Sequence, residues 1–291
     1  MHHKPNFFIL GAGKCGTTSL YAYLKQHPQI FMSPVKEPSF FCESFQVVDN
    51  AIDYFRLFDG VREETIIGEA SHVYFSNPAS AGVLKTLFPD ACFVVILRHP
   101  ADRAYSLYHH MRRYGFEYVD SFEKALEVEE KRFASDRFTE TCPQYIHNYY
   151  YYRSGRFGEQ VKRYFDLFER DRFHFLTLDQ LKADPDRSIR EIFNHLGVDA
   201  TAAIDTRVHN AGNLTRRHAT LQYFWRTRLF PVLRRRKQFQ ICEWVIRLLD
   251  RINLMPVPPM NPATRSALAV RYAPDLKKLA SLTGVTFPAD C

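Results

Sequence analysis

The segment 11–18, Gly-Ala-Gly-Lys-Cys-Gly-Thr-Thr, directly follows the apolar run Phe7–Leu10. It is close to the phosphate-binding loop G-x4-G-K-[ST] of nucleoside triphosphatases, because two of its glycines and the hydroxyl of Thr18 have the right spacing. Thr17 stands where that loop has its lysine, however, and Lys14 lies inside the loop instead. The segment therefore predicts a site that holds a phosphate but is not built for the β,γ-phosphates of ATP.

A strand, a glycine-rich turn and a helix that opens at about Thr17 together favour anion binding. The first N–H groups of a helix have no partner inside it, and the helix dipole attracts negative charge there. The glycines allow the backbone to come close to the ligand. The plainer alternative is a turn that only joins strand to helix. We expect the phosphate to contact Lys14, Cys15, Gly16, Thr17, Thr18 and Ser19.

A second anion pocket is predicted where the continuous apolar run 93–97 ends in Arg98. Such a run is typical of a strand that is buried on both faces of a parallel sheet. In ATPases this strand often ends in an acidic residue that helps to hold magnesium. Here the arginine is followed by Ser106, one to two helical turns further on. This pattern favours negative charge, and we expect no metal site.

Two stretches resemble the donor-binding motifs of sulfotransferases. Residues Lys14–Leu20 resemble the 5′-phosphosulfate loop, and Leu97–Tyr108 resemble the 3′-phosphate motif. The resemblance points to the bacterial branch related to the heparan-sulfate N- and O-sulfotransferases, and it runs from Phe7 to about Thr286. It implies transfer of a sulfuryl group from 3′-phosphoadenosine 5′-phosphosulfate (PAPS) to a hydroxyl or amine, with the bisphosphate PAP as product and no metal.

The resemblance also implies roles for single residues. Glu37 matches the glutamate that acts as base in the heparan-sulfate branch, and it follows the carboxyl end of the second expected strand, where sites in such sheets lie. Without the resemblance, the sequence favours a surface carboxylate beside Lys36 and Pro38 for Glu37. Lys14 would stabilise the charge that grows on the leaving group. His110 matches a histidine of the N-sulfotransferase site, with His109 as its solvent-facing neighbour, or the reverse.

Later residues complete the expected site. Arg216, with Arg217 beside it, matches the basic position of a loop that closes over the donor, and arginine suits a bidentate phosphate clamp. In the segment Gly68–Ser71, Ala70 stands where the heparan enzymes have an acceptor-binding lysine, and His72 replaces a proline. This departure weakens a heparan-type acceptor and makes His72 a candidate for acceptor contact. Carbohydrate, lipid and small metabolite acceptors remain open.

The net charge of +7 is concentrated in one stretch. Residues 216–251 hold ten lysines and arginines against Glu243 and Asp250. Apolar residues in its second half fall at helical spacing, which predicts a basic helical insertion at about 217–255. Its charges are simply solvated, or they contact an anionic membrane surface or a polyanionic acceptor through 217–251. Nucleic acid is the least favoured partner, because no nucleic-acid fold signature accompanies the patch.

The remaining pattern predicts an α/β fold, with 1–291 as a single P-loop-like domain whose central, mostly parallel sheet is flanked by helices. Strands are expected near 7–10, 29–33, 65–69, 93–97 and 173–178, and helices near 17–26, 79–88, 101–113, 121–132, 157–168, 185–196 and 263–283.

No apolar run approaches the ~20 residues of a membrane span, and no signal segment is seen. The six cysteines form no CxxC pair, which suits a reducing compartment. We therefore expect a cytoplasmic protein, or in one alternative a protein that is peripheral at the inner membrane surface. The rival functions are a P-loop kinase-like phosphotransferase and a non-enzymatic module that binds polyanions or membranes.

Overall fold

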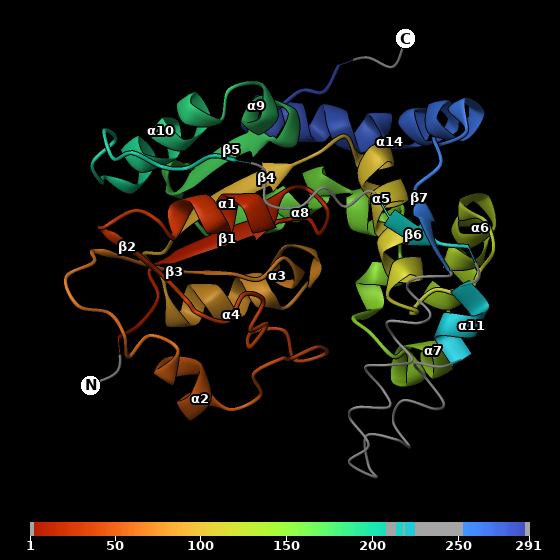
Figure 1. Cartoon of the computed structure of the whole chain (residues 1–291), viewed down its shortest axis with the longest axis horizontal. Coiled ribbons are helices and arrows are strands. Elements are labelled where there is room, and N and C mark those ends of the chain that lie inside the picture. The colour runs from red at the N-terminus through yellow and green to blue at the C-terminus, as the bar shows by residue number, and fades with distance from the viewer. Residues whose placement is uncertain (1–2, 208–213, 218, 225–252, 289–291) are drawn as a thin grey trace. The chain divides into compact units, whose positions relative to one another are not determined.

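The computed structural model describes residues 3–207, 214–217, 219–224 and 253–288 (Figure 1). The chain forms two compact units. The first unit contains Met1–Pro100, Arg156–Asn210 and Arg271–Cys291, and the second contains Ala101–Gly155 and Ala211–Val270. Most of the basic insertion expected at 217–255 lies outside the described residues, so that insertion and its contacts remain predictions, as does the single-domain assignment.

The first unit is built on a five-stranded sheet in the order β2-β3-β1-β4-β5. Every pairing within it is parallel, and the sheet is flanked by helices, which confirms the predicted fold class (Figure 1). The central strand β1 is buried at all five positions, as expected for a strand covered on both faces. The strands are β1 Phe7–Gly11, β2 Ile30–Met32, β3 Ile66–Ala70, β4 Cys92–Leu97 and β5 Phe173–Thr177.

The helices of the first unit begin and end at recognisable capping residues. Helix α9 begins with a capping box between Thr177 and Gln180. Helix α10 begins at Pro185 after the Asp184 cap and ends at Gly197, whose φ is 69°. The helices are α1 Thr17–Leu24, α2 Ala51–Arg56, α3 Val73–Ser76, α4 Ser80–Leu87, α8 Phe157–Phe165, the short 3-10 turn Arg170–Arg172, α9 Leu178–Ala183 and α10 Pro185–Leu196.

The C-terminal helix α14, Pro262–Thr283, contributes its second half to the first unit. There the carboxylate of Asp275 accepts hydrogen bonds from the backbone N–H groups of Gly158 (2.9 Å) and Glu159 (3.1 Å). These groups lie in the first turn of α8, where backbone donors lack helical partners. The late segment thus caps a helix that is more than a hundred residues earlier in the chain.

The second unit combines helices with a small antiparallel pair of strands. A buried ion pair joins Glu117 to Arg132 at 2.6 Å, and the hydroxyl of Tyr151 donates to the same carboxylate at 2.7 Å. The elements are α5 Pro100–Arg113, α6 Phe122–Phe133, α7 Asp136–Thr141, the 3-10 turns Ile146–Tyr149 and Arg153–Gly155, β6 Leu214–Arg216, α11 Ala219–Phe224 and β7 Leu254–Pro256.

All the long elements expected from the sequence are present, with ends that differ by at most three residues. The short helices α2, α3, α7 and α9 were not predicted, because four to six residues are too few to show a helical repeat. Among the described residues, no helix is long and apolar enough to span a membrane.

Candidate active site

The glycine-rich loop has the backbone of an anion cradle. It leaves β1 at Gly11, and helix α1 begins after Gly16, whose φ of 99° is one that glycine adopts readily. Lys14 also has a positive φ, 74°. No side chain of the described residues caps this helix, and its first turn holds no acidic residue. The turn is therefore open to an external anion, and the donor set fits a phosphate group.

The side chains of this loop divide into two sets. Cys15 and Thr17 are buried, and the backbone N–H of Cys15 already donates to the carbonyl of Ala12 at 3.1 Å, so the group that Thr17 can offer an anion is its backbone N–H. Lys14, Thr18 and Ser19 are half-buried. The loop predicted to hold the phosphate is thus in place, with one cation and two hydroxyls on its partly exposed side.

Glu37 lies in the same unit and is paired rather than exposed alone. Its Oε2 accepts hydrogen bonds from the ring Nδ1 of His72 (2.7 Å) and from the backbone N–H of His72 (2.8 Å). Lys36 forms an ion pair with Oε1. Burial raises the pKa of Glu37, but His72 and then Lys36 outweigh burial and lower the pKa to about 2. Glu37 is therefore a carboxylate at any physiological pH.

The ring of His72 also lies against the phosphate-binding loop. A Cβ placed on Gly13 would be 2.9 Å from Cδ2 and 3.3 Å from Nε2 of His72. Because a carboxylate can only accept, Nδ1 of His72 carries the proton toward Glu37, which leaves the lone pair of a neutral ring on Nε2. The structure thus brings together the loop, Glu37 and His72, and the pairing of Glu37 with His72 was not predicted.

A second carboxyl group of this region was missed from the sequence. Glu69 lies in β3 and is 0% exposed, in a strand that is otherwise apolar or glycine. Burial raises its pKa to about 8, and the nearby Glu37 adds to this, while the hydroxyls of Tyr74, Tyr54 and Ser71 act in the opposite direction. The signal for it was a charged residue inside a buried strand.

The second predicted anion pocket is divided between the two units. Arg98 follows β4 in the first unit and is half-buried, whereas Ser106 and His110 are half-buried residues of α5 in the second. The ring of His110 packs on Tyr114, with centroids 4.7 Å apart. Of the two neighbouring histidines, His109 is the buried one, at 7% exposure. A pocket that joins Arg98, Ser106 and His110 remains a prediction.

Arg216 and Arg217 are at the second unit's small sheet. Arg216 is buried, its Nε donates to the carbonyl of Arg113, and its own carbonyl accepts from Nη2 of Arg112 at 3.3 Å. Arg217 is exposed, and its backbone N–H donates to Asn253 at 2.9 Å. The exposed side chain is thus the more accessible of the two predicted phosphate clamps, and the clamp remains a prediction.

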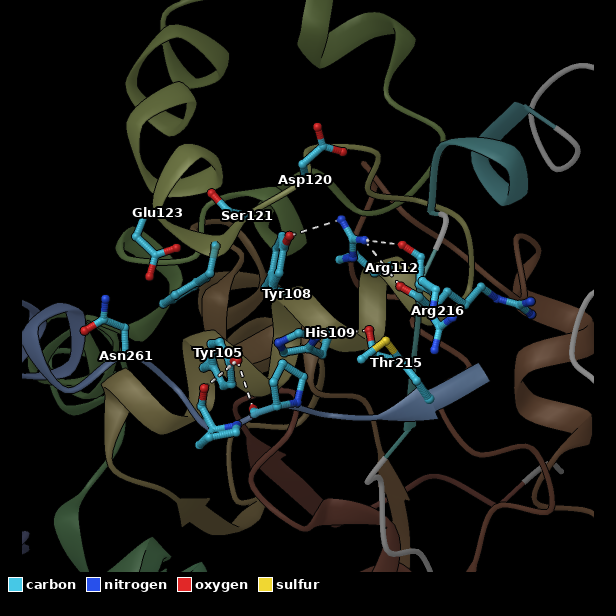
Figure 2. A pocket seen from close by; sticks show the side chains of 15 residues that line it. Tyr105, Tyr108, His109, Arg112, Asp120, Ser121, Glu123, Thr215, Arg216 and Asn261 are labelled. Carbon is cyan, nitrogen blue, oxygen red and sulfur yellow. Dashed lines mark hydrogen bonds between the residues drawn. The ribbon is translucent and has the colours of Figure 1, made fainter. Parts of the chain in front are cut away.

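The second unit contains a cavity of about 400 Å³ between α5, the start of α6 and the strands β6 and β7 (Figure 2). Its walls include Tyr105 and Phe122, with His109 between Tyr105 and Thr215. Nδ1 of His109 lies 2.9 Å from the hydroxyl of Thr215, and burial and then Arg112 lower the pKa of His109 to about 4. The histidine is therefore neutral at pH 7.

Arg112, which lines this cavity, forms its hydrogen bonds with other residues of the second unit. The guanidinium of Arg112 donates to the Tyr108 hydroxyl (3.2 Å) and to the carbonyls of Val119 (2.7 Å), Arg216 (3.3 Å) and Arg217 (3.4 Å). The cavity has the size of a small-molecule site. The guanidinium of Arg112, however, already forms hydrogen bonds that join α5 to β6.

With the loop and the Glu37–His72 pair defined, the class of the protein is clear. The chain belongs to the sulfotransferase-domain family, whose model matches residues 4–237. This confirms the resemblance seen in the two donor motifs.

Three individual sulfotransferases are similar to this chain in sequence or structure. The crystal structure of a sulfotransferase from Alicyclobacillus acidocaldarius has 30% sequence identity and a TM-score of 0.73, and the match covers 98% of each chain. The membrane-associated sulfotransferase kil1 of Dictyostelium discoideum is 36% identical over 109 residues, which are 36% of this chain and 22% of the relative. The bifunctional heparan sulfate N-deacetylase/N-sulfotransferase 1 of Caenorhabditis briggsae is 25% identical over 192 residues, 62% of this chain and 21% of the relative. The chain thus spans about a fifth of the length of these two curated relatives.

Proposed function

We propose that the protein transfers the sulfuryl group of PAPS to a hydroxyl or amine acceptor by in-line displacement. The observation that carries the proposal is the contact between the loop residue Gly13 and the His72 ring that Glu37 holds. An anion cradle and a paired base at its rim are the two parts that such a transfer needs.

The loop would bind the 5′-phosphosulfate end of the donor. Its backbone N–H groups and the hydroxyls of Thr18 and Ser19 would hold the phosphate oxygens. Lys14 would stabilise the negative charge that develops on the leaving phosphate oxygen as the bond to sulfur breaks. Arg98, Ser106 and Arg217 are proposed for the 3′-phosphate.

The Glu37–His72 pair would remove the proton of the acceptor. A carboxylate whose pKa is about 2 is a weak proton acceptor by itself. The imidazole that it orients has the edge with Cδ2 and Nε2 near Gly13 of the loop, so Nε2 would take the proton, and Glu37 would stabilise the imidazolium that forms. We therefore assign proton removal to His72 and orientation of its ring to Glu37, which revises the role expected for Glu37 from the sequence.

The first test is donor binding, which needs no acceptor. PAP at about 100 times its Kd should stabilise the folded protein by about 2.7 kcal/mol, because it binds the native state alone. The measurement is a thermal melt with PAP, with ATP plus magnesium, and with AMP as a control that lacks the second phosphate. A protein stabilised by ATP and magnesium but not by PAP would instead be a P-loop phosphotransferase.

The second test identifies the acceptor. Purified protein is incubated with ³⁵S-labelled PAPS and a cell extract, and the labelled product is characterised. We expect label in one product class, with none formed by a Lys14→Ala variant. Equal labelling by wild type and variant would contradict the proposal.

A further inference from the structure

The segment 37–41 carries Glu37 and has an unusual backbone. Glu37 has a φ of 63° and Ser39 a φ of 55°. Non-glycine residues adopt such angles at a cost, and they persist only where the surroundings hold them. What holds this segment is therefore part of what holds the Glu37–His72 pair.

Two hydroxyl groups beneath the segment supply part of that hold, beside backbone hydrogen bonds such as the one from Glu37 N–H to the carbonyl of Ala70 at 2.9 Å. The backbone N–H of Ser39 donates to Oγ of Ser71 at 3.0 Å, and that of Phe41 donates to the hydroxyl of Tyr74 at 3.3 Å. Each hydroxyl oxygen thus accepts from the segment, so its own hydrogen is available to another acceptor.

Glu69 lies beside both hydroxyls. Oγ of Ser71 is 3.5 Å from Oε2 of Glu69, and the Tyr74 hydroxyl acts on the same carboxyl group. Within the described residues, Oε1 of Glu69 and the hydroxyl of Tyr54 have no hydrogen-bond partner, although both are buried. The neighbouring hydroxyls thus compensate a buried charge on Glu69 only in part, whereas a protonated acid carries no such penalty.

We propose that Glu69 is a positioning residue of the active site: it accepts from the Ser71 and Tyr74 hydroxyls that help to fix the segment carrying Glu37, and its ionisation disturbs the Glu37–His72 pair by placing a second negative charge near Glu37. This inference rests on the proposed function for its catalytic meaning, but the geometry on which it stands is independent of the donor and the acceptor.

The groups that face Glu69 determine when it ionises. They are Tyr54 from α2, Tyr74 from α3 and Glu37 from the segment after β2. Burial and Glu37 raise the pKa, and the net value is about 8. Glu69 is therefore protonated at pH 7 and ionised above pH 8, where it places a second negative charge below Glu37.

The experiment follows the ring of His72 by NMR, so that it needs neither donor nor acceptor. The His72 ring resonance, assigned with a His72→Gln variant, is titrated from pH 6 to pH 10 in wild type and in Glu69→Gln. We expect the His72 resonance to show a step near pH 8 in wild type that is absent in Glu69→Gln, because the amide resembles the neutral acid and cannot ionise. A step that persists in Glu69→Gln, or its absence from wild type, would overturn the inference.

Two further variants separate positioning from folding. Glu69→Leu keeps the site apolar but offers the hydroxyls no acceptor, so the amide resonances of Ser39 and Phe41 should shift while PAP still stabilises the protein. Tyr54→Phe removes a hydroxyl that lowers the pKa of Glu69 but keeps the ring that packs on Phe40 and Phe41 of the segment, with centroids 4.7 Å and 4.9 Å away. It should therefore move the step to higher pH and leave those amides in place. Unchanged amide resonances of Ser39 and Phe41 in Glu69→Leu would contradict the inference. If wild type does not bind PAP, that result would contradict the proposed function alone.

In a turnover assay with labelled PAPS, we expect the rate of wild type to decline above pH 8, where Glu69 ionises. Glu69→Gln should retain the rate at pH 7 within about threefold and should show no such decline. The KM for PAPS should be unchanged. A decline above pH 8 that is identical in wild type and Glu69→Gln would count against the positioning role.

Discussion

Three residues of the candidate site have a backbone conformation that side chains disfavour. Lys14, Glu37 and Ser39 have φ values of 74°, 63° and 55°, and they are the described non-glycine residues with positive φ. Strain of this kind is of the order of 1 kcal/mol or more per residue and tends to gather at functional sites. Its concentration here supports the loop and the 37–41 segment as the centre of the chemistry.

Replacing Glu37 by glutamine should reduce turnover by about 10²-fold to 10⁴-fold, because His72 loses the charge that orients its ring and stabilises its protonated form. PAP binding, measured by thermal shift, should be retained, since Glu37 is not part of the cradle. His72→Gln should give a similar loss, and the double variant should be little worse than either single one. Full turnover in Glu37→Gln would remove the pair from the mechanism.

Acid should weaken the fold through the same carboxylate. The pKa of Glu37 is lowered from 4.5 to about 2, so the native state holds its proton less tightly than the unfolded chain does. The resulting stabilisation, up to roughly 3 kcal/mol, is complete above about pH 5 and is lost as the pH falls toward 2.

The measurement is urea unfolding between pH 6 and pH 2.5. The stability difference between wild type and Glu37→Gln should shrink as the pH falls, whereas an exposed control, Glu63→Gln, should show little difference throughout. A constant difference would mean that the carboxylate is not held by His72 and Lys36 as described.

Among single residues, the loop and the two candidates Glu37 and His72 were predicted from the sequence, but their pairing was not. The two residues are 35 positions apart, and they meet because β2 and β3 are neighbours whose carboxyl ends share one edge of the sheet. Residue spacing cannot show such a long-range contact. Glu69 was missed for a similar reason, since its neighbours come from α2, α3 and the 37–41 segment.

Among the elements, α8 shows how closely the first unit is packed. A Cβ on Gly158 would lie 2.5 Å from the carbonyl oxygen of Asp275 and 3.0 Å from the backbone nitrogen of Leu279. Both are backbone atoms of α14 and cannot rotate away. Glycine at 158 is therefore what allows Asp275 to approach and cap α8.

Gly158→Ala should destabilise the protein by about 1–3 kcal/mol, because the two helices must separate and the cap is weakened. The matched control is Gly82→Ala in α4, where a Cβ meets nothing within 4 Å. That change should stabilise by about 0.5–1 kcal/mol, since alanine favours a helix interior. Chemical denaturation of both variants measures the contrast, and equal effects would contradict the packing.

The long helices and strands were predicted from the sequence, whereas the short helices were not. The strands around 7–10 and 93–97 and the long helices have clear periodicity or unbroken apolar runs, and their positions were predicted from these alone. The short helix α3 begins at Val73, directly after His72, and depends on tertiary packing rather than on local signals. The sheet order was not predicted, since strand order depends on pairing between distant segments.

At the level of the whole molecule, the first unit is built from three separate segments of the chain. The last of them supplies Tyr272 and Leu279, both 0% exposed, besides the capping Asp275. Burying two large apolar side chains contributes several kcal/mol, a large share of the ~5–15 kcal/mol that stabilises a typical domain.

A chain that ends after Val270 should therefore have a largely unfolded first unit. Hydrogen exchange should show loss of protection in β1 and β4, and PAP should no longer stabilise the protein. A control that ends after Pro288 should behave like the full chain. Protection of β1 in the shorter chain would show that the last segment is dispensable.

The missing side chain at Gly13 has a practical use. An alanine there must displace the His72 ring, because the added carbon would lie 2.9 Å from it, and the ring can swing aside more easily than the backbone can. Such a protein would still offer its cradle to the donor but would hold the base away from the acceptor. A Gly13→Ala variant loaded with donor is thus a rational substrate trap, with which the natural acceptor could be captured intact from a cell extract.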